Sequence, residues 1–232
     1  MKAITISDYG SPDVLKLKDV AKPVVKENEV LVRVCAASIN AGDIFSMRGS
    51  PWLARFSVGF PKPKDYILGW DMAGTVEAVG TAVTLFKLGD EVFTAGNGAF
   101  AEYVVVREDK LAIKPTNLTF EQASAVPTAA LTALHGLRDA GKLQPGQKVL
   151  INGASGGVGI FAVQLAKVFG AEVTGVCSTA KLSMVREWGA DHVIDYTRED
   201  FARGRRRFDV ILDIGGNRTL SDLRSVLTDD GT

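Results

Sequence analysis

Hydrophobic and polar residues follow one pattern up to about residue 115 and another after it. The first part has short runs of alternating apolar and polar residues, each ended by glycine, proline or asparagine. Such runs predict strands joined by tight turns. The expected strands cover residues 2–7, 15–19, 29–37, 72–79, 91–93 and 101–106. Many short strands with frequent glycines favour a barrel-like fold.

From residue 119 onward, short apolar runs alternate with longer segments of helical period. The expected helices cover residues 119–126, 128–140, 158–169, 180–188 and 218–227, and the strands 148–152, 172–177, 192–195 and 209–214. Alternating strands and helices predict a parallel, doubly wound sheet. We therefore expect an α/β protein with one domain at residues 1–120 and a Rossmann-type domain at residues 121–232.

A glycine-rich turn between the first strand and the first helix of that sheet carries the clearest chemistry. The turn spans residues 153–159 and follows the strand directly. Small residues let the backbone approach a pyrophosphate, and the helix N-terminus supplies unpaired N–H groups. The expected cofactor-binding residues are Ala154, in place of the usual first glycine, Ser155, Gly156, Gly157, Val158 and Gly159.

The end of the chain is unusual for this fold. Four strands of the sheet are predicted, whereas dinucleotide-binding sheets of this type have six. Residues 228–232 have the composition of a turn leading into a fifth strand. We therefore expect a truncated domain with an apolar edge at residues 210–212.

Composition excludes several classes of partner. The chain carries 27 basic and 27 acidic residues, so bulk charge does not favour nucleic acid or a membrane surface. No apolar run reaches the roughly 20 residues that span a bilayer. Two distant cysteines, Cys35 and Cys177, argue against a disulfide scaffold and predict two buried thiols in a cytoplasmic protein.

Several segments, taken in order along the chain, resemble one known family. They are residues 38–43 (SINAGD), 68–76 (LGWDMAGTV), 87–92 (KLGDEV), 98–103 (GAFAEY), 130–134 (ALTAL), the glycine turn, and 189–196 (GADHVIDY). The chain resembles the zinc-free medium-chain dehydrogenase/reductases of the NADPH:quinone oxidoreductase and zeta-crystallin kind. The resemblance implies a GroES-like catalytic domain, NADPH as cofactor and a homodimeric parent protein.

Residue types at the family's metal positions predict that no zinc is bound. Zinc-dependent relatives have cysteine near Asn40 and histidine where this chain has Trp70. A structural zinc needs four closely spaced ligands, and the chain has two cysteines in all. Without a Lewis acid, a quinone or an α,β-unsaturated carbonyl is favoured as acceptor, because conjugation spreads the developing charge.

The residues after the second strand of the sheet favour NADPH over NADH. An NAD-binding domain carries a carboxylate there to bind the ribose. This chain has Ser178 and Lys181 instead. In the resembled family, residues matching Lys181 and Tyr196 contact the 2′-phosphate, and Ser178 could add a hydrogen bond. The alternative is that Lys181 is a solvated helix-start residue and Tyr196 a packing residue.

The resemblance also places two residues beside the nicotinamide, Asn40 and Thr132. Asp43 is expected to cap a helix rather than to catalyse. Phe45 stands where several quinone reductases have a tyrosine, so a tyrosine proton donor is in doubt. Residues 52–64 form either a lid or substrate-pocket loop or a surface-packed loop, and the arginines of residues 203–207 form a solvated connection opposite the ligand crevice.

Three functions follow from these observations. The first is a zinc-independent oxidoreductase that transfers hydride from NADPH to a small quinone or enone. The second is an enoyl or alcohol-type reductase on the same scaffold. The third is an NADPH-binding protein or fragment without turnover.

Overall fold

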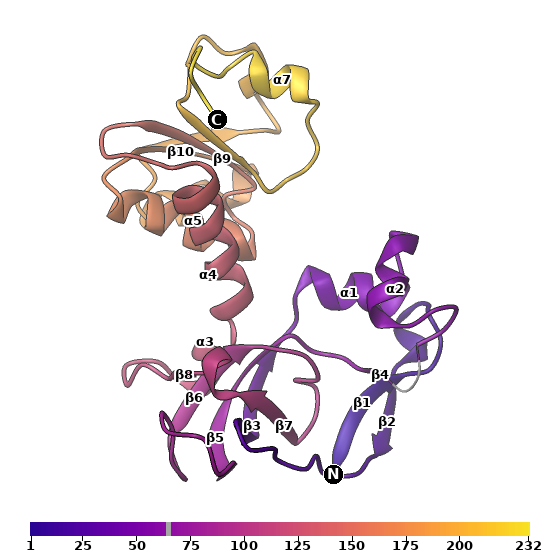
Figure 1. Ribbon diagram of the computed structural model, residues 1–232. Helices are drawn as coiled ribbons and strands as arrows, with labels where there is room; N and C mark the ends of the chain where they lie inside the picture. Colours follow the sequence, from indigo (N-terminus) through magenta and orange to yellow (C-terminus); the bar gives the residue numbers. More distant parts are fainter. Residues whose placement is uncertain (64–65) are drawn as a thin grey trace. The chain divides into compact units, whose positions relative to one another are not determined.

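The chain folds into two compact units, Met1–Thr128 and Ala129–Thr232. The computed structural model describes residues 1–63 and 66–232 (Figure 1). The units divide later than the boundary that we expected at residue 120. The reason is that helix α3 (Phe120–Ser124) packs against strands of the first unit.

The first unit contains two sheets. The five-stranded sheet has the order β7-β3-β5-β6-β8, and the three-stranded sheet has the order β2-β1-β4. The strands are β1 (Lys2–Ile6), β2 (Lys16–Asp19), β3 (Glu29–Ser38), β4 (Tyr66–Ile67), β5 (Asp71–Val79), β6 (Glu91–Ala95), β7 (Tyr103–Arg107) and β8 (Ala112–Ile113). Besides α3, its helices are α1 (Ala41–Arg48) and α2 (Arg55–Val58). The two-residue strands β4 and β8 were not predicted, because they are too short to show a pattern.

Alternation along β3 and β5 gives this unit its main core. The inward-facing residues are Val30, Val32, Met72 and Val76, all buried. A second cluster joins Ile6 of β1, Met47 of α1 and Leu68. This second cluster fixes α1, and therefore the chemistry at its N-terminus, on the body of the unit.

The second unit is a parallel sheet of order β11-β10-β9-β12. Its strands are β9 (Lys148–Asn152), β10 (Glu172–Cys177), β11 (His192–Asp195) and β12 (Val210–Asp213). Its helices are α4 (Pro127–Leu134), which begins in the first unit, α5 (Gly157–Val168), α6 (Leu182–Glu187) and α7 (Leu220–Arg224). Three of the four strands have the bounds expected from their apolar runs.

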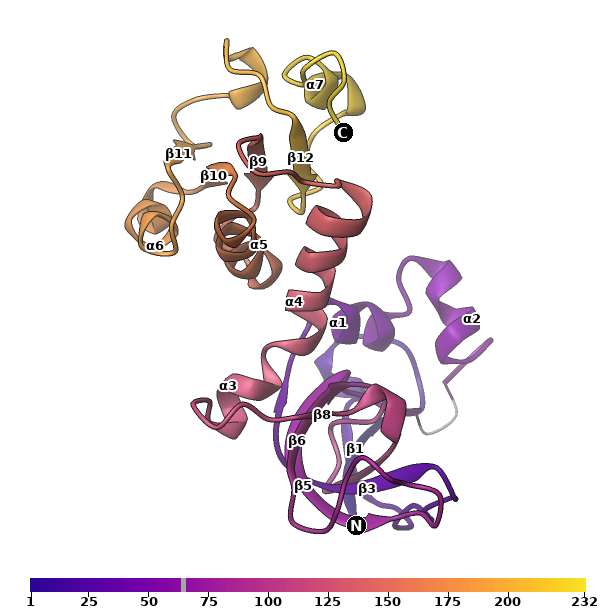
Figure 2. The same ribbon diagram turned by 60° about the vertical axis from the view of Figure 1, so that its left-hand side comes forward.

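Both faces of this sheet are covered, as a doubly wound fold requires. Val149, Ile151 and Val173 pack with residues of α5 and α6 on one face. Leu150, Val176 and Phe208 pack with Val226 and Leu223 on the other. Figure 2 shows α5 and α6 on one side of β9 and β10 and α7 on the opposite side.

Three local features differ from expectation or refine it. The helix predicted at residues 128–140 changes at His135 into a π-helix (His135–Ala140). Cys177 is buried as predicted, but Cys35 is exposed, so that prediction was wrong; Cys35 lies on the solvent side of β3. The apolar edge at β12 is partly covered, because Ile211 N–H donates to Thr232 O at 2.8 Å.

None of the helices in the described ranges is both long and apolar enough to cross a membrane.

Candidate cofactor and active site

The glycine turn links β9 to α5 in the geometry that phosphate binding needs. Gly153 adopts a left-handed conformation, with φ 87°, and starts the turn. Gly156 is the N-cap residue of α5, so Gly157 and Val158 lie in its first turn. The first N–H groups of a helix have no partner within it, and the helix dipole adds positive potential there. Ser155, Gly157 and Val158 therefore border the N-terminus of α5, where an anion would be stabilised.

Ala154 and Gly159 hold this turn against the sheet. The N–H of Ala154 donates to Val176 O at 3.0 Å, and its methyl group is buried. Ala154 thus contributes packing to the site, and its N–H is already used. A side chain at Gly159 would collide with the carbonyl oxygens of Gly153 and Ala154. Gly175 of β10 is needed too, because a Cβ there would come within 3.0 Å of the Ala154 methyl. Gly175 was not predicted as a site residue; its only signal is a glycine inside a strand.

The predicted 2′-phosphate residues lie at the carboxyl end of the same sheet. Ser178 follows β10 directly, and Lys181 N–H donates to Ser178 O at 2.9 Å. Tyr196 follows β11, and its N–H donates to Cys177 O at 3.1 Å. The structure therefore brings the loops of Ser178, Lys181 and Tyr196 together. Lys181 and Tyr196 are both exposed, which leaves their side chains available to a ligand.

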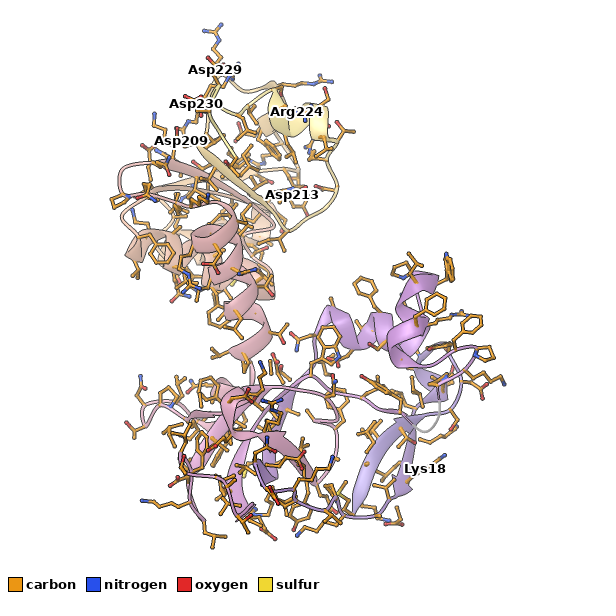
Figure 3. The ribbon with its side chains drawn as sticks, in the orientation of Figure 1. Lys18, Asp209, Asp213, Arg224, Asp229 and Asp230 are labelled. Atoms are coloured by element: carbon orange, nitrogen blue, oxygen red, sulfur yellow. The ribbon has the colours of Figure 1, made fainter. Side chains whose placement is uncertain are left out.

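A polar cluster at the end of β9 and β12 was not predicted. Asn152 Nδ2 donates to Asp213 Oδ1 at 2.7 Å and to Asn217 Oδ1 at 3.0 Å. Strand order reverses between β9 and β12, and ligands of doubly wound sheets bind at such a switch point. Figure 3 marks Asp213 at the carboxyl end of β12 and Asp209 at its start. A carboxylate that ends an otherwise apolar strand is the signal that identifies Asp213.

In the first unit, Asn40 is held by a buried carboxylate. Asn40 is the N-cap residue of α1. Its Nδ2 donates to Asp71 Oδ2 at 3.2 Å and to Ser38 Oγ at 3.3 Å. Asp71, which is fully buried, also accepts from Thr128 N at 2.9 Å and Thr128 Oγ1 at 2.6 Å. The orientation of the Asn40 amide is thus set by Asp71, which was not predicted as a site residue.

Trp70 and Thr128 line a cavity beside this network. The cavity measures about 360 Å³, and its other lining residues are Ala95, Gly96 and Asn97. The Trp70 ring packs over Gly42, where a Cβ would overlap it. Trp70 stands where zinc-dependent relatives have histidine, and its indole N–H can only donate. In the described part of the chain, no group of three His, Cys, Asp or Glu side chains is arranged to hold a metal ion.

Thr132 and Asn40 belong to different units. Thr132 lies on α4 within Ala129–Thr232, and Asn40 lies within Met1–Thr128. Asp43 occupies the third position of α1, where its Oδ2 accepts from Asn40 N–H at 2.7 Å. The N-cap residue of α1 is therefore Asn40, and not Asp43 as we expected; Asp43 takes part in the cap as the third-position partner of Asn40.

Helix α1 and the segment after it expose four aromatic side chains, Phe45, Trp52, Phe56 and Phe60, which we call the aromatic cluster. All four side chains are more than half exposed. The ring centroids of Phe56 and Phe60 are 5.4 Å apart in a stacked arrangement, and Trp52 meets Phe56 edge-on at 5.6 Å. Residue 64, at the end of the predicted loop, lies outside the described residues. The exposure of these rings fits a surface that receives another molecule better than a packed loop.

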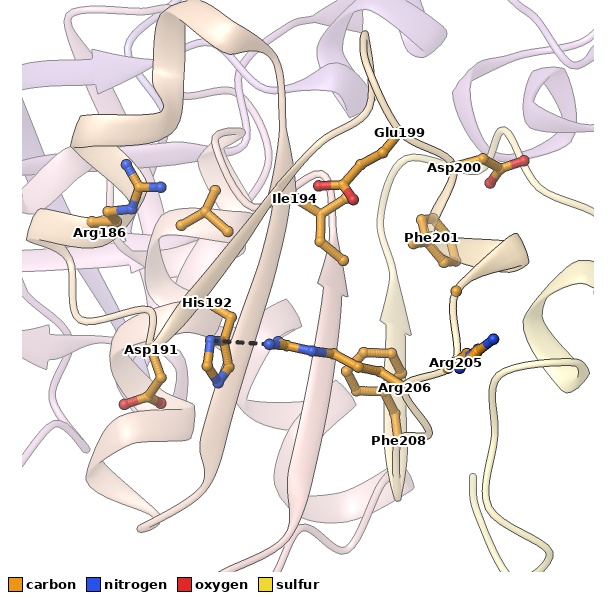
Figure 4. Close-up of a pocket in the computed structure, with 12 residues that line it drawn as sticks. Arg186, Asp191, His192, Ile194, Glu199, Asp200, Phe201, Arg205, Arg206 and Phe208 are labelled. Atoms are coloured by element: carbon orange, nitrogen blue, oxygen red, sulfur yellow. Dashed lines mark hydrogen bonds between the residues drawn. The ribbon is translucent and has the colours of Figure 1, made fainter.

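The arginines of residues 203–207 lie away from the glycine turn. Arg206 and Arg207 border a hollow with Lys148 and Glu172, which begin β9 and β10, so the run lies at the amino end of the sheet as expected. Arg205 and Arg206 also line a cavity of about 450 Å³ along the edge of β11. Figure 4 shows Arg206 reaching across it toward His192; their nitrogens are 3.5 Å apart.

The surroundings of Asp43 predict a pH-dependent stability for the first unit. Burial raises its pKa above the usual range, backbone N–H groups of Asn40 and Gly69 lower it in part, and Asp71 raises it further. Its Oδ1 is buried without a hydrogen-bond partner. Because the folded state then holds the proton more firmly than the unfolded state, rising pH above about 4 lowers the free energy of unfolding.

Asp43→Asn removes this titration. We expect the stability advantage of the wild type over the variant to be largest near pH 4 and to shrink toward about pH 7. Urea unfolding of both proteins across this range measures the difference. An advantage that grows with pH would contradict the assignment.

Comparison with known proteins identifies the family. The family model described as "Alcohol dehydrogenase GroES-like domain" matches residues 26–116, and the one described as "Zinc-binding dehydrogenase" matches residues 157–232. The chain is 42% identical over 229 residues to 2-methylene-furan-3-one reductase of Solanum lycopersicum, covering 93% of this chain and 57% of that protein. It is 36% identical to quinone oxidoreductase of Sus scrofa, covering 100% of this chain and 71% of that protein.

A solved structure shows the same fold. Quinone oxidoreductase of Escherichia coli complexed with NADPH superposes with a TM-score of 0.87 at 31% identity, covering 100% of this chain and 71% of that one. The chain spans less than two thirds of the tomato reductase. It has the GroES-like unit and the Rossmann-type sheet of these relatives. The chain belongs to the quinone oxidoreductase and alkenal/one reductase family of the medium-chain dehydrogenase/reductases, whose members are NAD(P)H-dependent oxidoreductases.

Proposed function

We propose that this protein transfers hydride from NADPH to a quinone or an α,β-unsaturated carbonyl. The observation that carries the proposal is the carboxyl edge of the second unit. There the helix start at Gly157, the Ser178–Lys181 loop and Tyr196 follow three neighbouring strands, β9, β10 and β11, and the strand order reverses on the other side of β9. A Cβ at Gly157 would meet no atom within 4 Å, so the space beside this residue is open.

Charge at this edge supports NADPH rather than NADH. Directly after β10 the chain has Ser178 and Lys181, and no carboxylate stands there to bind a ribose diol. A lysine ammonium stabilises a 2′-phosphate by a charge-assisted hydrogen bond. The Escherichia coli relative binds NADPH in its solved structure, which supports the same choice.

NADPH supplies the hydride, and the chain's own residues orient the reactants. Asp71 fixes the Asn40 amide at the start of α1, beside the cavity lined by Trp70 and Thr128. The indole of Trp70 is not a metal ligand. We therefore expect an acceptor whose own conjugated system spreads the negative charge that develops when hydride is added. A conjugated acceptor does so when hydride adds to it, and its oxygen then takes a proton from water. The exposed aromatic cluster offers flat surfaces for such a planar acceptor.

A substrate screen tests this proposal. We expect NADPH to be oxidised by quinones and enones and not by saturated ketones, as followed by loss of nicotinamide absorbance. Reduction of saturated ketones would instead favour an alcohol-type reductase. Tight NADPH binding without oxidation by any acceptor would favour a cofactor-binding protein without turnover.

The homodimer implied by the family resemblance stays a prediction. Sedimentation of the purified protein measures it.

A further inference from the structure

Asp195 is a buried carboxylate that the proposed reaction does not use. It ends β11 and is 6% exposed. Its oxygens accept from Thr179 Oγ1 at 2.5 Å, from Thr197 Oγ1 at 2.7 Å and from Thr197 N–H at 3.0 Å. Two hydroxyls and one backbone group from two separate loops therefore converge on one side chain.

These two loops are the ones that carry the candidate 2′-phosphate residues. Thr179 lies between Ser178 and Lys181 and begins a short 3-10 turn that ends at Lys181. Thr197 directly follows Tyr196. Each threonine is therefore within two residues of a side chain that would contact the phosphate. Removing the carboxylate takes away the acceptor that both loops share. The 2.9 Å contact between the Thr179 and Thr197 hydroxyls and the Tyr196 N–H bond to Cys177 O remain.

The negative charge of Asp195 needs an explanation, because a carboxylate near the loops of Lys181 and Tyr196 would repel a phosphate. Hydrogen bonds from Thr179 and Thr197 hold the pKa of Asp195 below its usual range, so the carboxylate is charged near neutral pH. Its oxygens are directed at the threonines, and Arg198 Nε lies 3.6 Å from Oδ2. Arg198 is 77% exposed at its side chain, so it offsets the charge on the solvent side.

We propose that Asp195 is a positioning residue that braces the Lys181 and Tyr196 loops and thereby sets the preference for NADPH over NADH. This inference rests on the proposed function. NADH has no 2′-phosphate, so its binding does not depend on how these two loops are held. Loss of the brace must therefore weaken NADPH binding selectively.

The test compares KM and kcat for both cofactors in the wild type and in Asp195→Ala. We expect KM for NADPH to rise about 10-fold, the order expected for losing hydrogen bonds to a charged group. KM for NADH and both kcat values should stay within about 2-fold, since the reacting ring is bound elsewhere. Asp195→Asn keeps one acceptor oxygen, so its KM for NADPH should lie between the values of the wild type and Asp195→Ala. If Asp195→Ala does not fold, Thr179→Val removes one bond of the brace with little change in volume.

Asp191→Asn is the matched control, because Asp191 precedes the other end of the same strand. It pairs with Lys167 at 2.8 Å and accepts from Val173 N–H at 2.7 Å. Its loss should lower stability without changing the ratio of the two KM values, which separates positioning from general destabilisation.

Two results would overturn the inference alone. One is a wild type that prefers NADPH together with brace variants that keep the preference. The other is tighter NADPH binding in Asp195→Asn, which would make Asp195 a simple source of repulsion. A wild type without any preference for NADPH would overturn the NADPH assignment and this inference with it.

Discussion

Gly159→Ala is expected to weaken NADPH binding by on the order of 100-fold, equivalent to about 2.7 kcal/mol. The new methyl group would overlap the carbonyl oxygens of Gly153 and Ala154, which are backbone atoms and cannot rotate away. The turn must shift as a whole, and overpacking of this kind also costs about 1–3 kcal/mol of stability. Calorimetric titration with NADPH and urea unfolding measure the two effects.

Gly157→Ala is the matched control for stability. Gly157 lies two residues earlier in the same helix, and a Cβ there meets nothing within 4 Å. Alanine is the better helix former by up to about 1 kcal/mol, so this variant should be as stable as the wild type or slightly more stable. Equal losses of stability in both variants would show that glycine flexibility matters here, not the close contact at Gly159.

Lys181→Ala is expected to raise the dissociation constant for NADPH by about 10- to 100-fold and to leave that for NADH unchanged. A hydrogen bond to a charged group contributes about 1.5–3 kcal/mol, and only NADPH presents a phosphate to this lysine. The measurement is fluorescence or calorimetric titration with each cofactor. The preference for NADPH should also weaken at higher salt, because Lys181 is exposed.

Lys148→Ala is the control for this lysine. Lys148 begins β9 at the amino edge of the same sheet, where the glycine turn does not reach. Its loss removes the same charge from the same unit. A similar drop in NADPH affinity in both variants would mean that net charge, not a site at Lys181, attracts the cofactor.

The second unit was predictable because each of its strands is built around a short apolar run. Strands such as Val149–Ile151 are buried on both faces, so their runs stand out from the polar turns. The turn at residues 153–159 was recognisable because a tight turn excludes most side chains, which leaves a run of small residues in the sequence. Strands β4 and β8 could not be predicted in this way, because two residues show no apolar run. They are strands only because each pairs with a neighbouring strand.

The polar networks were less predictable, because they depend on contacts between distant residues. Asp71 meets Thr128 across 57 positions, and Asn152 meets Asp213 across 61. Neither pairing leaves a local pattern. Cys35 shows the converse error: a small apolar side chain in a strand reads as buried, yet its residue faces solvent. Asp195 lay inside a quoted motif, but only the structure shows that it joins two loops.

Transfer of deuterium tests the central claim most directly. NADPH carrying deuterium at the reactive carbon of its nicotinamide ring is incubated with the protein and an enone, and the product is analysed by mass spectrometry and NMR. We predict one deuterium on the β-carbon of the saturated ketone, with the neighbouring proton coming from water. Product without deuterium, or NADPH that binds and stays unoxidised with every enone and quinone, would contradict hydride transfer by this protein.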